Sequence, residues 1–245
     1  MNRLVPLVAG LAILILTPRA VRTGPLYDAV VAGDFQTVSG YVAQGLFEDA
    51  GDLGTPLNAA VALGNKDIAV LLMDHGAGVE ASRGASGMRP LHFAASYRHP
   101  ELVSLLLARR ARVDARDNFG RTPLLIAASL GDAETARRLL DRGANVNVTG
   151  KLDHTPLHWA VFLGKRDLFN VVIDFGADIN APSLHGETPL HMAAMKGSLE
   201  MIGRLAALGA DINARRKDGQ TPLMLAKGYN TEEAVALLIR LGAAQ

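Results

Sequence analysis

Histidine and aspartate are the residues of this chain that could ligate a metal ion or move a proton. The clearest grouping is Asp153, His154 and His158, in which three possible ligands fall close together in the sequence. These residues flank an expected helix start and do not share one helical face, so they are not predicted to converge on one ion. We expect no metal and no cofactor. A cryptic metal-binding enzyme at these residues is the least favoured alternative.

Catalytic motifs are also missing from the sequence. The chain has no cysteine, which removes thiolate nucleophiles, disulfides and cysteine-based zinc sites. It contains neither a Gly-x-Ser-x-Gly elbow nor a phosphate-binding P-loop. The carboxylates fall mainly at expected helix ends and loop tips, where capping and the helix dipole explain them. We therefore expect a protein that is not an enzyme.

A repeat of about 33 residues organises the chain. The tripeptide Thr-Pro-Leu, once replaced by Arg-Pro-Leu, recurs six times, and its prolines are 34, 33, 33, 33 and 33 residues apart. An alanine-containing apolar stretch follows each tripeptide, and a segment rich in Leu, Ile and Val closes each unit. A period of this length indicates stacked supersecondary units. The six prolines are Pro56, Pro90, Pro123, Pro156, Pro189 and Pro222.

Each unit is predicted to hold two short helices and a turn. The threonine caps the first helix, and proline suits its first position because the amide hydrogen it lacks has no partner there. In one unit Gly131 ends this helix, and a second helix follows over residues 134–140. Gly143 suits a left-handed C-cap and Gly120 a tight turn. One such pair cannot bury its own apolar face, so the units must stack.

The chain resembles the ankyrin-repeat family over roughly residues 24–245, through a Thr-Pro-Leu-His-x-Ala motif seen complete at residues 155–160. The resemblance implies an all-α fold, an ankyrin-repeat solenoid of stacked helix-turn-helix units joined by β-turn loops. It also implies that His92, His158 and His191, at the fourth motif place, bond the backbone within their own loops. The first and last of seven repeats are expected to be caps. The expected repeats span approximately residues 24–50, 52–81, 86–115, 118–147, 151–180, 185–213 and 218–245.

Two residues depart from the family motif. Arg89 stands where the capping threonine is expected, and Asp153 stands where the turn glycine is expected. Aspartate tolerates the left-handed conformation better than most residues, so the turn is still predicted there. The stretch from Gly76 to Gly87 holds one extra residue, and local opening is expected first near Gly84 to Gly87.

Residues 1–23 are interpreted as a signal peptide or N-terminal anchor. Arg3 precedes an apolar run over residues 4–16, and a polar segment follows it. A helix of that length reaches about 20 Å, which is short of the ~30 Å hydrocarbon core of a bilayer. We expect a periplasmic or secreted protein. The alternative is an uncleaved anchor at residues 4–16 that makes the repeats a membrane-anchored cytoplasmic adaptor.

Charge is unevenly distributed along the chain. Residues 25–82 carry a net charge of −7, and residues 83–142 carry +5. The arginines of the second segment are expected mainly on second helices and the adjoining loops, where they are interpreted as a solvated convex face paired with nearby acids. An acidic partner or an anionic membrane surface is the alternative interpretation.

Function is expected at a surface, and the family resemblance implies a concave face built from loop tips and first helices. Apolar residues there in neighbouring repeats would form a hydrophobic stripe, the kind of patch that marks an interface. We expect a monomer that binds a protein partner. Nucleic acid is not expected, because the formal net charge is only +1 and aromatic residues do not alternate with basic ones. The expected partner-binding residues are Tyr97, Phe119, Leu130, Leu152, Phe162, Leu163 and Met195.

Overall fold

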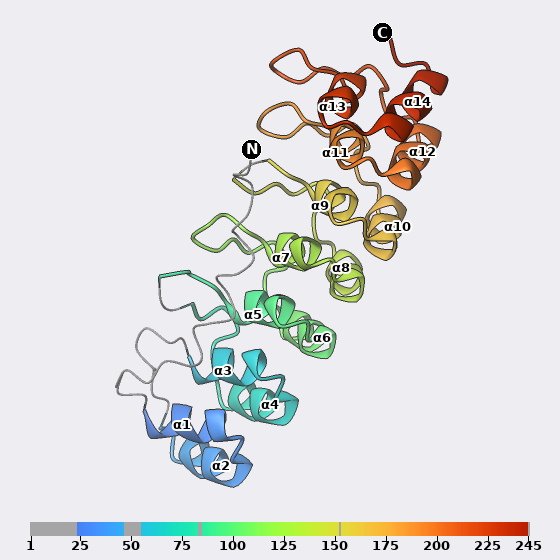
Figure 1. Cartoon of the computed structure of the whole chain (residues 1–245). Coiled ribbons are helices and arrows are strands. Elements are labelled where there is room, and N and C mark those ends of the chain that lie inside the picture. The colour runs from blue at the N-terminus through green and yellow to red at the C-terminus, as the bar shows by residue number, and fades with distance from the viewer. Residues whose placement is uncertain (1–23, 47–54, 83–84, 152, 245) are drawn as a thin grey trace.

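The computed structural model describes residues 24–46, 55–82, 85–151 and 153–244. Within these residues fourteen helices and no strand occur, and the helices form seven consecutive pairs (Figure 1). The first helices of the pairs are α1 (Pro25–Ala32), α3 (Pro56–Ala62), α5 (Pro90–Ser96), α7 (Pro123–Leu130), α9 (Pro156–Phe162), α11 (Pro189–Lys196) and α13 (Pro222–Gly228). The second helices are α2 (Phe35–Ala43), α4 (Lys66–Asp74), α6 (Pro100–Ala108), α8 (Ala133–Leu140), α10 (Arg166–Asp174), α12 (Leu199–Ala207) and α14 (Glu232–Arg240).

First helices stack on first helices and second helices on second helices, so the molecule is a two-layered solenoid (Figure 1). The loops between successive pairs project to one side, beyond the first helices. We call these projections the finger loops, and the side on which they lie the finger side. Each of the seven expected repeat ranges contains one helix pair.

The predicted capping chemistry is present at the first helices. The Thr55, Thr122 and Thr155 hydroxyls each accept a hydrogen bond from the backbone three residues on, at 3.3–3.4 Å. Gly131 ends α7 in the left-handed conformation at φ 70°. The side chain of Arg89 makes no capping bond to the backbone of α5, but the His92 ring accepts from the Arg89 amide at 3.1 Å, so this helix start keeps only one of the two capping bonds.

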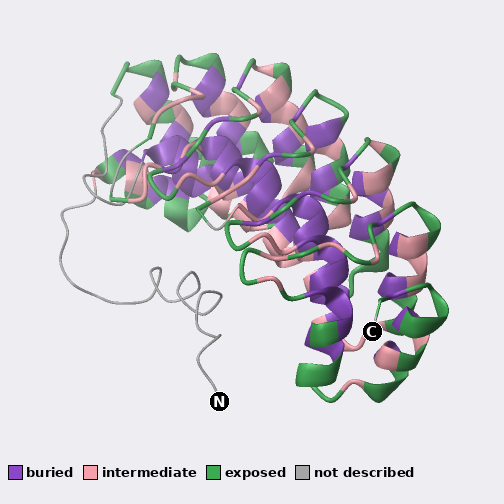
Figure 2. Ribbon diagram, turned by 90° about the horizontal axis from the view of Figure 1, so that it is seen from above, coloured by how far each residue is buried: buried purple, intermediate pink, exposed green. Residues whose placement is uncertain are grey.

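The core is one continuous apolar seam between the two layers (Figure 2). Small residues let the helices approach closely: Ala94 and Ala95 of α5 are completely buried. Burying a leucine side chain stabilises the fold by roughly 1.5–3 kcal/mol, and the motif supplies one such leucine to every repeat. These leucines are 0–2% exposed: Leu26, Leu57, Leu91, Leu124, Leu157, Leu190 and Leu223.

The finger loops have the turns that the sequence predicts. Gly120 has φ 76°, and Asp153 adopts the same left-handed region at φ 54°, as expected for its place in the motif. Neighbouring fingers also bond to each other through their backbones. The Asn118 amide donates to the Ser86 carbonyl at 2.9 Å, and the Lys217 amide donates to the His185 carbonyl at 3.0 Å. These bonds fix the spacing of the fingers along the stack.

The motif histidines bond the backbone of their own repeats, as the family resemblance implies, and each also bonds the next repeat, which the resemblance did not predict. In repeat 5, Nδ1 of His158 accepts from the Thr155 amide at 3.2 Å, within its own repeat. Its Nε2 donates to the Glu187 carbonyl in the next finger at 3.0 Å. His92 and His191 make the same pair of bonds, so each imidazole ties one repeat to the next.

A second set of side chains ties the repeats together below the fingers. Each one accepts a hydrogen bond from a backbone amide that lies 31 or 32 residues on, at 2.8–3.2 Å. The stack is therefore held by side-chain bonds between repeats as well as by its apolar seam. The acceptors are Glu80, Asp114, Asn147, Asn180 and Asn213.

Three expectations fall outside the described residues. They are the signal peptide or anchor at residues 1–23, the position of Leu152, and part of the junction before repeat 3, at residues 83–84. Among the helices that are described, none has the length and apolar character needed to cross a membrane.

Candidate protein-binding face

The predicted partner-binding residues lie along the finger side, on the ends of first helices and on the finger tips. Tyr97, Leu130, Phe162, Leu163 and Met195 follow their Thr-Pro-Leu motifs at two adjacent places. All five side chains are half-buried, not fully exposed. The stripe is therefore more recessed than the sequence suggested.

Phe119 is the most exposed of the predicted residues that the structure describes. It lies at the tip of the repeat 4 finger with 48% of its surface accessible. The Arg121 guanidinium carbon lies 5.1 Å from the ring centroid and the Lys151 ammonium lies 5.6 Å from it, so cations from two neighbouring fingers flank the ring.

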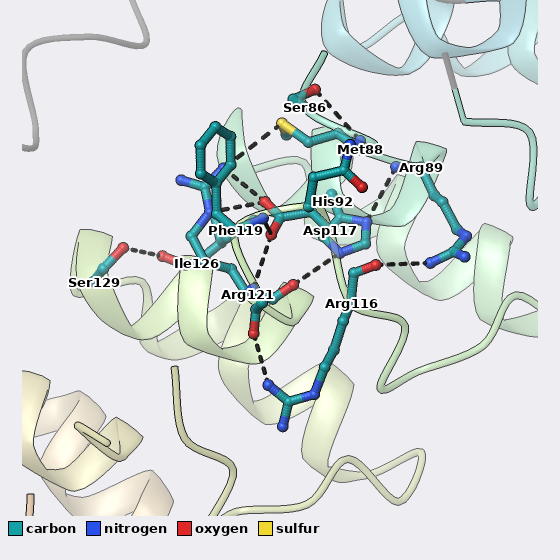
Figure 3. A network of polar contacts seen from close by, with 12 residues as sticks. Ser86, Met88, Arg89, His92, Arg116, Asp117, Phe119, Arg121, Ile126 and Ser129 are labelled. Carbon is teal, nitrogen blue, oxygen red and sulfur yellow. Dashed lines mark hydrogen bonds and ion pairs between the residues drawn. The ribbon is translucent and has the colours of Figure 1, made fainter. Parts of the chain in front are cut away.

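The finger that carries Phe119 is held rigidly from below (Figure 3). The Asp117 carboxylate is inaccessible to solvent and accepts from the amides of Phe119 and Arg121 at 2.9 and 2.8 Å. It also pairs with the Arg121 guanidinium at 2.7 Å. Arg116 donates to the Gly120 carbonyl at 2.7 Å, and the Arg89 guanidinium donates to the Arg116 carbonyl at 3.1 Å. Repeats 3 and 4 thus present Phe119 on a preformed tip.

An aromatic cluster lines the face in repeat 5, and a lysine from repeat 6 lies over it. Trp159 contacts Phe162 edge to face, with ring centroids 6.3 Å apart, and His154 contacts Trp159 in the same way at 6.0 Å. The Lys196 ammonium from α11 lies 4.4 Å from the Phe162 centroid. This arrangement places a cation directly over an aromatic floor.

Two of the predicted residues also have packing roles. Leu130 packs against a small cluster formed by Met88, Ala95 and Ile126, and its carbonyl accepts from the Arg98 guanidinium at 2.6 Å. The Tyr97 ring stacks on His99 at 6.5 Å. Substitution of either residue would disturb the scaffold as well as the surface.

Two exposed residues on the same face were not among those predicted. Leu63 is 48% exposed and Tyr229 is 55% exposed. Both occupy the motif place of Tyr97, Leu130 and Leu163, in repeats 2 and 7. Extending the 33-residue spacing to repeats 2 and 7 would have predicted both residues. They extend the apolar row over most of the stack.

The buried histidines do not form a metal site. Both ring nitrogens of His158 are engaged in hydrogen bonds, and burial lowers the pKa of this imidazole to about 4. Burial also lowers the pKa values of His92 and His191. Across the described parts of the chain, no group of three or more His, Cys, Asp or Glu side chains could hold a metal ion.

Models of ankyrin repeats match residues 26–117, 110–183 and 172–226. The chain belongs to the ankyrin-repeat family. Its fold is likewise similar to the crystal structure of the ankyrin repeat domain of Bcl-3, described there as a unique member of the IkappaB protein family. The TM-score is 0.78 at 29% sequence identity, over 89% of this chain and 99% of that one. The all-α ankyrin solenoid predicted from the sequence is thereby confirmed.

Curated relatives share a shorter stretch with this ankyrin-repeat protein. Ankyrin repeat domain-containing protein 13C-B of Xenopus laevis is 34% identical over 95 residues, or 38% of this chain. Ankyrin repeat domain-containing protein 13C of Mus musculus is 35% identical over 97 residues, or 39% of this chain. The match covers 18% of each of these two relatives, so it concerns their repeats and not the remainder of either protein.

Proposed function

We propose that this ankyrin stack is a non-catalytic module that binds a protein partner through its finger tips and the C-terminal ends of its first helices. The observation that carries the proposal is the row of accessible apolar side chains at one motif place in repeats 2 to 5 and in repeat 7, which Lys196 interrupts in repeat 6. The row runs from Leu63 through Leu163 to Tyr229, with Phe119 beside it on a finger tip. Accessible apolar patches of this kind mark protein interfaces.

The rigidity of the fingers supports the same proposal. Phe119 is fixed by the buried Asp117 carboxylate, and Phe162 is fixed between Trp159 and Lys196. Side chains that are ordered before binding lose little conformational entropy on binding. Large aromatic side chains in such settings supply most of the binding free energy at interfaces.

Other repeats of this chain indicate which residue can replace Phe162 and Met195 without loss of the fold. Serine occupies the motif place of Phe162 and Met195 in repeats 3 and 4, as Ser96 and Ser129, so the scaffold accepts it there. The double variant Phe162→Ser/Met195→Ser removes the apolar floor of repeats 5 and 6 and leaves the motif intact.

The measurement is capture of native partners by the wild type and by this variant, compared by quantitative mass spectrometry. Ile239→Ser is the control, because it removes an apolar side chain, 38% exposed, from the second-helix layer. We expect the floor variant to lose the captured partners and the control to keep them, with circular dichroism showing both folded. Equal capture by the floor variant and the wild type would refute the proposed face.

For the N-terminal segment we propose export, with the apolar run at residues 4–16 acting as a signal peptide. N-terminal sequencing of the native protein tests this proposal. A mature start near Val21 in the soluble exported fraction supports it. An intact Met1 in the membrane fraction would contradict it and favour the anchored adaptor.

A further inference from the structure

The formal net charge of the chain is near zero, but charged residues are distributed unevenly between the two helix layers. In repeats 3 to 7, the first helices and the turns after them carry four basic residues and one acidic residue. The second helices of the same repeats carry five basic and seven acidic residues. The first-helix layer is therefore the more positive of the two helix layers. The two sets are residues 90–99, 123–132, 156–165, 189–198 and 222–231, and residues 100–108, 133–140, 166–174, 199–207 and 232–240.

The single acidic residue of the first helices and their turns already accepts a hydrogen bond. Asp132 caps α8 by accepting from the Thr135 amide at 3.1 Å. On the second-helix side, by contrast, the arginines pair with neighbouring acids: Arg138 bonds both Glu101 and Glu134 at 2.8 Å. Arg137 and Arg138, the two arginines of α8, are thus paired with acids, as the solvated-face interpretation expects for them.

Two lysines of the finger side lie over aromatic rings, without a carboxylate partner among the ion pairs of the described residues. The Lys196 ammonium lies 4.4 Å from the centroid of Phe162, and the Lys151 ammonium lies 5.6 Å from that of Phe119. A ring contact orders a lysine and partly shields it from water, but it leaves the positive charge uncompensated. A carboxylate brought to either ammonium would meet an oriented cation beside an apolar surface.

The aromatic residues are arranged for a peptide and not for nucleic acid. Single-stranded nucleic acid binds by stacking its bases on open aromatic faces. Here Lys196 covers a face of Phe162, and Trp159 is held between Phe162 and His154 by edge contacts. What remains accessible is a half-buried apolar floor that includes Leu163 and Met195.

We infer that the partner segment is an acidic, extended peptide, with carboxylates that pair with Lys151 and Lys196 and apolar side chains that pack on Phe162 and Met195. This inference rests on the proposed function and names the chemistry of its partner. Neighbouring repeats are about 10 Å apart, and extended chain rises about 3.3 Å per residue, so one repeat corresponds to about three peptide residues.

The test uses the full chain and a fluorescein-labelled peptide of about 12 residues built from Glu-Leu-Ser triplets, which follows that spacing. The reference peptide has glutamine in place of every glutamate. At about 50 mM salt we expect the acidic peptide to bind about tenfold more tightly than the reference, and at about 500 mM salt we expect this preference to disappear. Trp159 is the only tryptophan, so its emission reports binding at the cluster directly.

Charge-removing variants locate the effect. Lys151→Gln and Lys196→Gln are each expected to weaken acidic-peptide binding by about fivefold at low salt. Lys66→Gln is the matched control, because it removes the same charge from an exposed site on the second helix α4 and should leave the affinity unchanged.

Four results would overturn the inference: no binding of the acidic peptide at low salt, equal binding of the glutamine peptide, an equal loss in the Lys66→Gln control, or displacement of the peptide by a single-stranded oligonucleotide. Binding of the glutamine peptide that is lost in Phe162→Ser/Met195→Ser would refute the acidic partner and retain the proposed face. Acidic-peptide binding that this double variant leaves unchanged would refute both.

Discussion

The stability of the stack should fall as the pH drops from 7.5 to 5, and His158 should account for a defined part of that fall. The fold holds this imidazole neutral, because it is completely buried and its Nδ1 accepts a hydrogen bond. An unfolded chain binds a proton at a pKa of about 6.5, whereas the folded His158 has a pKa of about 4. Between these two values protonation favours the unfolded state.

The magnitude follows from the two pKa values. The stability that His158 contributes is fully present above pH 6.5 and is lost as the pH falls toward 4. The loss is about 2 kcal/mol at pH 5 and about 3 kcal/mol at pH 4. Measurements between pH 7.5 and 5 stay above the range in which most carboxylates titrate.

The informative variant is His158→Asn, because the same motif place in repeat 2 is occupied by the buried Asn58. The variant should be less stable than the wild type at pH 7.5, since it loses hydrogen bonds of the imidazole. This difference should shrink by about 2 kcal/mol at pH 5, because asparagine does not titrate.

The assay is urea unfolding at each pH, followed by Trp159 emission, which reports on the repeat that contains His158. His75→Asn, at an exposed histidine on the C-cap of α4, is the control and should give a curve parallel to the wild type. Wild-type and His158→Asn stabilities that stay parallel between pH 7.5 and 5 would refute the reasoning.

Two further predictions concern the fingers. Gly219→Ala should lower the free energy of unfolding by about 1 kcal/mol, because the backbone there is left-handed. Gly186→Ala should lower it by about 1 kcal/mol more, because the added carbon would also lie 3.0 Å from the Lys217 amide nitrogen. Equal urea midpoints for the two variants would count against the finger-to-finger contact. Asp117→Asn should lower stability by about 2 kcal/mol, because it weakens the buried pair with Arg121 and two amide bonds. Hydrogen exchange should then quicken at the Phe119 and Arg121 amides, and unchanged protection there would contradict the bracing role of Asp117.

The fold was predictable because each repeat contains the residues that begin and end its own helices and turns. Threonine caps, first-turn prolines and turn glycines act within a few residues of one another, so their spacing indicates helices and turns directly. Even the departure at Asp153 was predictable, since its place in the motif demands a left-handed turn and aspartate can supply it. The missing side-chain cap at Arg89 follows from the same reasoning, because a guanidinium has no acceptor for a backbone amide.

Exposure along the binding face was less predictable, because it depends on contacts between repeats. Leu130 and Leu63 occupy the same motif place, yet Leu130 is half-buried by a cluster that includes Met88 from the neighbouring finger, and Leu63 is 48% exposed. The second bond of His158 was missed for the same reason, since its acceptor lies in the next repeat. A motif describes one repeat and does not describe the side chains that its neighbours bring to it.

The central claim is that a protein partner covers the finger side of this stack. Hydroxyl-radical footprinting of the native complex, compared with the free chain, measures this most directly. We predict that Phe119, Phe162 and Met195 lose reactivity in the complex, while Ile239 and Leu208, which are exposed on or beside second helices, keep theirs. Protection at Ile239 and Leu208 with unchanged reactivity at Phe119 and Phe162 would contradict the account.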